Sequence, residues 1–137
     1  MTDEQFYEAY LIALEIVNKN KHNTDIDWVW GVTTPSMSVL SGIVKDINDI
    51  YKSGIHIETG EYFATVYGAL VLKEASCAGV SRAVGLCMSI LDIPYEHINE
   101  DKWLHQYIRV VVWSGVYGEY IRLDAQSMIG GSDGFVE

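Results

Sequence analysis

The spacing of apolar residues changes once along this chain, and that change limits the fold more than any other sequence feature. Up to about residue 91 the apolar residues recur every three or four positions, which predicts amphipathic helices. After Pro94 apolar and polar residues alternate, which predicts strands. Helices first and antiparallel strands last are typical of an α+β domain. We therefore expect helices packed on a small antiparallel sheet.

Four helices are expected in the first part of the chain. A capping box at residues 2–5 predicts the start of the first helix. The second begins at Thr34-Pro35 and ends at Gly54, because proline favours a helix start and glycine a helix end. The third spans about 61–72 and the fourth about 77–91. The apolar face of the first helix is expected to consist of Phe6, Tyr10, Leu14 and Val17.

The alternating part predicts three strands, at 95–99, 105–113 and 119–124. A turn at 114–118 joins the last two into a hairpin. A length of 137 residues suits one domain. The domain is divided into a helical N-terminal part (1–60), a core that carries the candidate chemistry (61–125) and a loose tail (126–137).

The charge balance excludes some classes of partner. Nine Lys and Arg residues against nineteen Asp and Glu give a formal net charge of −10. Nucleic acids and anionic membranes attract basic surfaces, so neither is expected as a partner, and a neutral or basic substrate fits better. No apolar run reaches the roughly 18 residues of a membrane span. The acidic N-terminus does not resemble a signal peptide, so a cytoplasmic location is expected.

The two cysteines are expected to differ. Cys77 falls in the first turn of the fourth predicted helix, where free N–H groups and the helix dipole favour a nucleophilic thiolate. Cys87 follows ten residues later among apolar neighbours and is interpreted as a buried packing residue. Ten helical residues span about 15 Å, too far for a disulfide between the two.

The predicted hairpin supplies a base for this thiol. If Ser114-Gly115 is a two-residue turn, His105 lies directly opposite Asp124, within reach of a hydrogen bond. A thiol, an imidazole and a carboxylate that orients the imidazole form a triad for acyl transfer. The alternative is that His105 is a surface strand residue and Asp124 only ends a strand. Periodicity alone places neither residue beside Cys77.

Several short segments resemble the transglutaminase-like cysteine protease superfamily. They are Tyr67-Gly68-Ala69-Leu70-Val71, Ser76-Cys77-Ala78-Gly79, Leu91-Asp92-Ile93-Pro94-Tyr95, His105-Gln106-Tyr107 and Tyr120-Ile121-Arg122-Leu123-Asp124-Ala125. The resemblance covers about 65–125 and implies a transglutaminase-like core with Cys77 as nucleophile, His105 as base and Asp124 as its orienting residue. Asp92 stands where the family has glycine, and aspartate also adopts the left-handed conformation.

An oxyanion hole needs hydrogen-bond donors aimed at the developing charge. The backbone N–H of Cys77 is the first candidate. In such enzymes a second donor comes from a side chain, and the candidates here are Trp28, Trp30, Tyr67 and Gln106. For both tryptophans, a place in the core or in the groove lining is the alternative interpretation.

The resemblance implies a thiol-dependent amide hydrolase or acyltransferase that acts on peptides or proteins through an acyl-enzyme. Hydrolysis is favoured, since a small domain has few elements to keep water from the intermediate. No cofactor or metal is expected, because the Cys and His residues lack zinc-site spacing and no phosphate loop is present. The alternative is a catalytically inactive module for protein binding or self-association through exposed strand edges. The sequence does not decide whether the chain forms a homo-oligomer.

Overall fold

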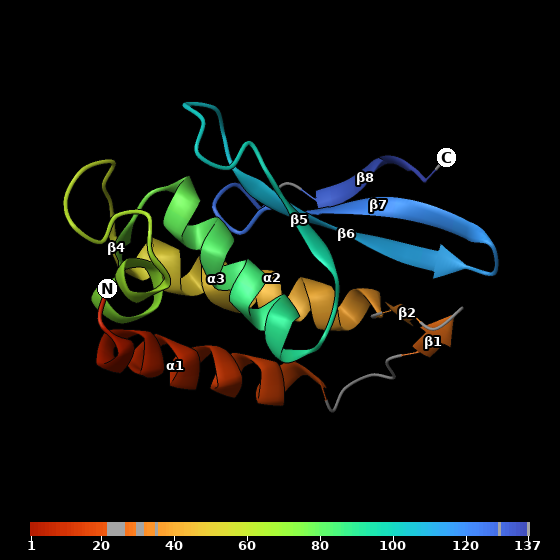
Figure 1. The fold of residues 1–137 in the computed structure, drawn as a ribbon, viewed down its shortest axis with the longest axis horizontal. Coiled ribbons are helices and arrows are strands. Elements are labelled where there is room, and N and C mark those ends of the chain that lie inside the picture. Colours follow the sequence, from red (N-terminus) through yellow and green to blue (C-terminus); the bar gives the residue numbers. More distant parts are fainter. Residues whose placement is uncertain (22–26, 30–31, 35, 129, 137) are drawn as a thin grey trace.

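A computed structural model describes residues 1–21, 27–29, 32–34, 36–128 and 130–136. Helices and strands lie in two layers (Figure 1). Helices α1 (Asp3–Lys21), α2 (Met37–Ser53) and α3 (Cys77–Ile90) pack against one another. Helix α3 also packs on the sheet, through strands β5 (Tyr95–Ile98) and β6 (Tyr107–Ser114). The predicted α+β class, with helices on a small antiparallel sheet, is confirmed.

The four-stranded sheet has the order β5-β6-β7-β8, with every neighbouring pair antiparallel. Strand β7 spans Tyr117–Leu123. The expected hairpin register is wrong by two positions, because Ser114 pairs with Tyr117 and the turn is Gly115-Val116. Gly115 has a φ of 63°, which a two-residue hairpin turn needs and glycine adopts at little cost.

The predicted loose tail is wrong for residues 130–135, which form strand β8 (Gly130–Phe135) beside β7. Gly131 and Gly134 have positive φ values, and the register shifts between Glu119 and Ile121, so the glycine-rich segment pairs irregularly. The ring of Phe135 lies 5.2 Å from that of Tyr117 across the two strands. The glycine content of this segment predicted a loop, but the segment forms a strand because its backbone pairs with β7.

The first helix begins as predicted but buries another face. Thr2 Oγ1 accepts from Gln5 N–H at 3.1 Å, and Gln5 Oε1 accepts from Thr2 N–H at 2.9 Å, which confirms the capping box. The buried residues are Ala9, Ala13, Ile16, Val17 and Asn20, whereas Phe6 is exposed. Small alanines let α1 approach α2 and α3 closely, which the apolar periodicity did not indicate.

Helix α2 begins two residues later than predicted. Ser36 caps it through its hydroxyl, and Thr34 instead ends strand β2 (Val32–Thr34), which pairs with β1 (Asp27–Val29). Gly54 ends the helix as predicted, for a different reason. Its φ is negative, and a Cβ there would lie 1.9 Å from the Lys73 carbonyl oxygen.

The predicted helix at 61–72 begins only at residue 66. Residues 58–65 are bends and turns, and a short π-helix, η1 (Gly68–Leu72), follows the helical residues 66 and 67. A two-stranded parallel sheet of β3 (Ile55–His56) and β4 (Glu74–Ala75) brackets this segment. Gly68 lies so close to the Tyr62 carbonyl oxygen that a Cβ would be 2.1 Å from it. This tight packing accompanies the bends that replace regular helix at 61–65.

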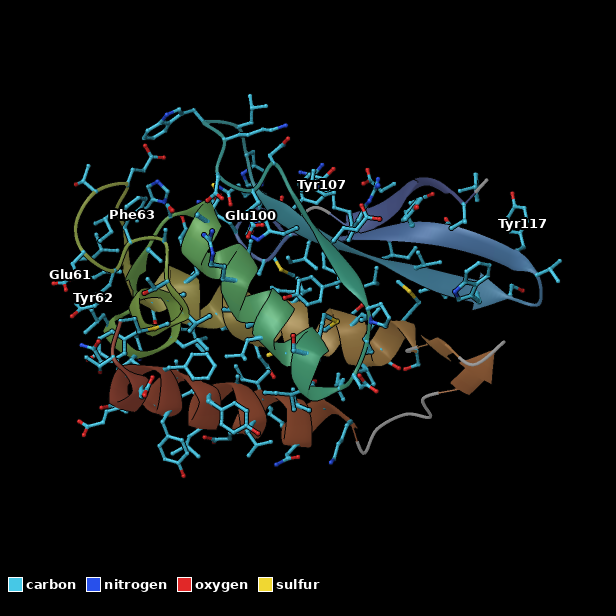
Figure 2. The ribbon with its side chains drawn as sticks, in the orientation of Figure 1. Glu61, Tyr62, Phe63, Glu100, Tyr107 and Tyr117 are labelled. Atoms are coloured by element: carbon cyan, nitrogen blue, oxygen red, sulfur yellow. The ribbon has the colours of Figure 1, made fainter. Side chains whose placement is uncertain are left out.

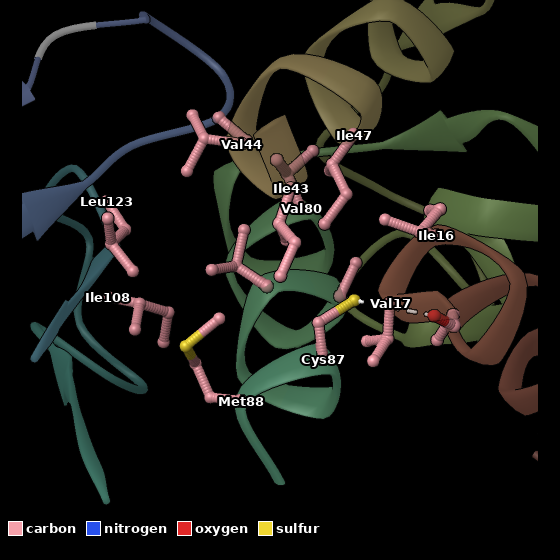
Figure 3. Close-up of a cluster of buried hydrophobic side chains, with 14 of the residues drawn as sticks. Ile16, Val17, Ile43, Val44, Ile47, Val80, Cys87, Met88, Ile108 and Leu123 are labelled. Carbon is pink, nitrogen blue, oxygen red and sulfur yellow. Dashed lines mark hydrogen bonds between the residues drawn. The ribbon is translucent and has the colours of Figure 1, made fainter. Parts of the chain in front are cut away.

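The core lies between the helices and continues to the inner face of the sheet (Figure 3). Helix α2 contributes Leu40, Ile43 and Ile47, and α3 contributes Val80, Cys87 and Met88. Ile108 and Leu123 cover this layer from the sheet. Nine of the fourteen residues of α3 are buried, so the helix is enclosed on most sides.

Candidate active site

Cys77 is the first residue of α3, as predicted. The Ser76 hydroxyl caps the helix by accepting from the Ala78 N–H at 3.2 Å. This cap leaves the Cys77 N–H without a hydrogen-bond partner among the described residues. Cys77 is partly exposed and lines a cavity of about 550 Å³. The thiol therefore has a helix N-terminus behind it and open space in front.

One wall of the cavity is the turn at 62–65, which includes Phe63 and Ala64. The Phe63 carbonyl oxygen accepts from the Ser76 N–H, and Arg82 donates to the Ala64 carbonyl oxygen at 3.1 Å. A Cβ at Gly79 would lie 2.8 Å from the Phe63 oxygen. The absence of a side chain at Gly79 thus makes room for this wall.

The opposite wall is the loop between β5 and β6. Asn99 and Asp101 both have a φ of 61°, a conformation that these residue types tolerate best after glycine. The Asn99 side-chain amide donates to the His105 carbonyl oxygen at 2.9 Å and fixes the end of the loop. Trp103 projects from this loop and is 94% exposed, although it lines the cavity. Figure 2 places Phe63 and Glu100 at this end of the molecule and Tyr117 at the other.

His105 and Asp124 are paired, as predicted. His105 Nε2 and Asp124 Oδ2 are 2.6 Å apart, and the Asp124 side chain is 1% exposed. Asp124 Oδ1 accepts from the Ser127 N–H at 3.2 Å. The pair forms although the expected register is wrong, because both residues lie just outside the paired strands, where the chain turns.

The pairing leaves the second ring nitrogen of His105, Nδ1, without a hydrogen-bond partner among the described residues. Cys77 and His105 line the same cavity from the helical layer and from the sheet. Within the described part of the chain the thiol and the imidazole share no hydrogen bond. Bonds between catalytic groups are often long in a free enzyme and shorten when substrate binds.

Of the two candidates for a second oxyanion donor whose side chains the structure describes, Tyr67 and Gln106, it is Gln106 that lines the cavity with Cys77. Its side-chain oxygen lies 2.7 Å from His97 Nε2, and it is buried. Tyr67 instead packs edge-on against Tyr62, at 5.2 Å between ring centres. Trp28 belongs to β1 by its backbone, its side chain lies outside the described part of the chain, and Trp30 lies outside it altogether.

His97 orients Gln106. Burial lowers the pKa of His97, against the opposing effects of Gln106 and Glu100, and so favours the neutral ring. With a proton on Nε2 the ring donates to the Gln106 oxygen, and the amide NH₂ group then faces away from His97; His97 Nδ1 lies 3.3 Å from Glu100 Oε2. Glu100 also approaches Arg82, at 3.6 Å, which connects this cluster to α3. His97 was not predicted as a site residue, because its polar neighbours in the sequence indicate a solvated position.

Arg122 is a second residue that the sequence analysis missed. Its Nη2 donates to Asp124 Oδ2 at 3.1 Å, so Asp124 touches a permanent cation as well as His105. Strand alternation contained the signal, since residues 122 and 124 share one face of a strand. By contrast, Cys87 is buried as predicted, its Sγ lies 3.9 Å from the Ala13 carbonyl oxygen, and burial raises its pKa to about 12.

Comparison of the chain with known protein families, with curated proteins and with solved structures finds no match. Within the described ranges, no helix combines the length and apolar character that a membrane span requires. No group of three or more His, Cys, Asp or Glu side chains in those ranges is arranged to hold a metal ion. The case for a function therefore rests on the geometry of the cavity and its lining.

Proposed function

We propose that this chain is a transglutaminase-like thiol hydrolase or acyltransferase that acts on peptide or protein amides. One observation carries the proposal: Cys77, at a helix N-terminus, and His105, held by the buried Asp124, open into one cavity. A nucleophile, a base and a residue that orients the base are the parts that covalent acyl transfer needs. The resemblance of the motifs around these residues supports the same assignment.

In the proposed reaction, His105 Nδ1 takes the thiol proton while Cys77 Sγ bonds to the substrate carbonyl carbon. The Cys77 N–H, which has no hydrogen-bond partner in the described part of the chain, donates to the oxyanion that forms. His105 then returns the proton to the leaving amine as the C–N bond breaks. Water attacks the resulting thioester, His105 takes a proton from that water, and the acid and free thiol are released. The open cavity favours water over a second amine.

The first test is the rate of Cys77 alkylation by iodoacetamide at pH 7, measured by mass spectrometry in the wild type and in His105→Ala. We expect the substitution to slow labelling by about 10-fold or more, because the imidazole no longer accepts the thiol proton. Iodoacetamide reports the thiol alone and needs no knowledge of the substrate.

Cys87 is the internal control. With its pKa raised to about 12 by burial, it stays a thiol at neutral pH and is expected to label only when the protein unfolds. Fast labelling of both cysteines indicates unfolding, and the measurement is then repeated at lower temperature. Equal Cys77 rates in the folded wild type and in His105→Ala contradict the proposal. They favour the second candidate, a binding module, for which the exposed Trp103 beside the cavity is the supporting observation.

A further inference from the structure

Asp124 accepts hydrogen bonds from two positively polarised partners on one oxygen. Its Oδ2 lies 2.6 Å from His105 Nε2 and 3.1 Å from Arg122 Nη2, and its Oδ1 accepts from the Ser127 N–H. The side chain is 1% exposed, so these groups replace its hydration. A buried carboxylate needs such partners, since burial without them strongly disfavours its ionised form. His105 therefore shares its carboxylate with a cation that never titrates.

The surroundings of Arg122 fix its guanidinium. The guanidinium carbon lies 3.8 Å above the ring of Tyr107, and the Tyr107 hydroxyl donates to Asp133 Oδ2 at 3.2 Å. The ring is thus held between Arg122 and strand β8. Arg122 Nε is buried and has no hydrogen-bond partner in the described structure. Burying an unpaired donor costs free energy, so this atom does not stabilise the position of the side chain. The contacts that keep Arg122 in place are the ring of Tyr107 and the carboxylate of Asp124.

We propose that Arg122 is a positioning residue of the triad, acting on His105 through Asp124. This inference rests on the proposed function. A cation beside the carboxylate disfavours a second positive charge on the imidazole, and it draws electron density from the oxygen that His105 contacts. Arg122 therefore keeps the imidazolium from becoming too stable. A base that holds its proton too firmly is slow to return it to the leaving amine.

The test is the titration midpoint of the His105 ring, followed by NMR in the Cys77→Ser background so that the thiol does not contribute. Arg122→Gln removes the charge and keeps a donor. We expect it to raise the midpoint by about 1 pH unit, the size of effect that a nearby charge produces. Arg122→Lys keeps the charge and is expected to leave the midpoint near that of the parent. The cavity around His105 is also lined by Cys77, Arg82, Glu58, Asp101 and Lys102. All of these except Cys77 keep their wild-type identity in every variant compared.

Arg109→Gln is the matched control. Arg109 also lies over a tyrosine ring, at 4.0 Å from the ring centre of Tyr120, and its ion pairs are with Glu96 and Asp133. Because it does not contact Asp124, its loss is expected to leave the His105 midpoint in place. A parental midpoint in folded Arg122→Gln overturns the proposal, as does an equal shift in Arg109→Gln.

Arg122→Gln removes the cation beside the buried Asp124 carboxylate, so a second comparison covers the case in which this variant fails to fold. The double variant with Asp124→Asn removes that charge as well. Its midpoint is expected to lie above that of Asp124→Asn alone, and equal midpoints overturn the inference. If these shifts occur but His105→Ala does not slow Cys77 alkylation, the proposed function fails and the influence of Arg122 on His105 stands.

Discussion

At the scale of single residues, Gln106 is the side chain whose role in the proposed chemistry can be tested most directly. It follows the candidate base directly, its oxygen contacts His97, and its amide NH₂ has no hydrogen-bond partner among the described residues. The amide lies at the cavity that Cys77 also lines. It is therefore suited to supply the second hydrogen bond to an oxyanion, beside the Cys77 N–H.

Gln106→Ala is expected to slow steady-state hydrolysis of p-nitrophenyl acetate by about 100-fold, since one oxyanion donor contributes roughly that factor. Cys77 alkylation by iodoacetamide is expected to be unchanged, because that reaction forms no oxyanion. Gln126→Ala is the control, since Gln126 lines the same cavity while its amide donates to Tyr51 at 3.3 Å. Equal losses in both reactions would instead show that Gln106 supports the site only as packing.

At the scale of elements, the start of α3 depends on a close approach between helix and turn. At Gly79 an added methyl group would meet two backbone oxygens, of Phe63 at 2.8 Å and of Thr65 at 3.1 Å. At Gly85, in the same helix, it would meet the ring of Tyr95 at 3.0 Å, and that ring is exposed enough to move. The two glycines therefore differ in their neighbours: backbone oxygens at Gly79 cannot easily move aside, whereas the side chain of Tyr95 at Gly85 can.

We expect Gly79→Ala to lower the free energy of unfolding by about 1–3 kcal/mol, the usual cost of overpacking. Gly85→Ala is expected to be neutral or stabilising, because alanine favours a helix over glycine by about 1 kcal/mol. Urea unfolding followed by circular dichroism measures both. Equal stabilities of the two variants would mean that the 62–65 turn is free to move away from α3.

The sequence predicts those elements that local signals determine. Helix α3 carries its own cap at Ser76, and its end is marked by Asp92, whose φ of 58° is the left-handed value expected there. Strand β8 and the π-helix η1 depend on pairing and packing with distant segments, which no local pattern records. Within the site, the His105–Asp124 pair was predicted from a two-residue hairpin turn, and it forms although that turn lies one residue further along the chain. The Gln106–His97 contact depends on how β5 lies beside β6.

At the scale of the whole molecule, a net charge of −10 competes with the local field of the helix. The N-terminus of α3 attracts anions to Cys77, whereas the surface as a whole attracts cations. We expect the long-range field to dominate at low ionic strength. A trimethylammonium methanethiosulfonate should then modify Cys77 about 10-fold faster than its sulfonate counterpart, after correction for their rates with a free thiol.

Salt provides the control for this comparison, because about 0.5 M NaCl screens charges beyond several ångströms. The preference for the cationic reagent should fall to roughly 2-fold or less there. A preference for the sulfonate at low salt would mean that the helix N-terminus and Arg82 control the field at the thiol. The rates are followed by mass spectrometry, which also shows whether Cys87 has reacted.

The thiol belongs to the helical layer, whereas the imidazole and its carboxylate belong to the sheet. The proposed chemistry therefore exists only while the two layers are docked. A partial opening of this interface separates Cys77 from His105 while every helix and strand keeps its own backbone hydrogen bonds. Heating should then reduce the His105-dependent part of Cys77 labelling before the far-ultraviolet signal changes. The proposed activity would then be lost through partial separation of the layers, at temperatures where far-ultraviolet circular dichroism still reports a folded protein.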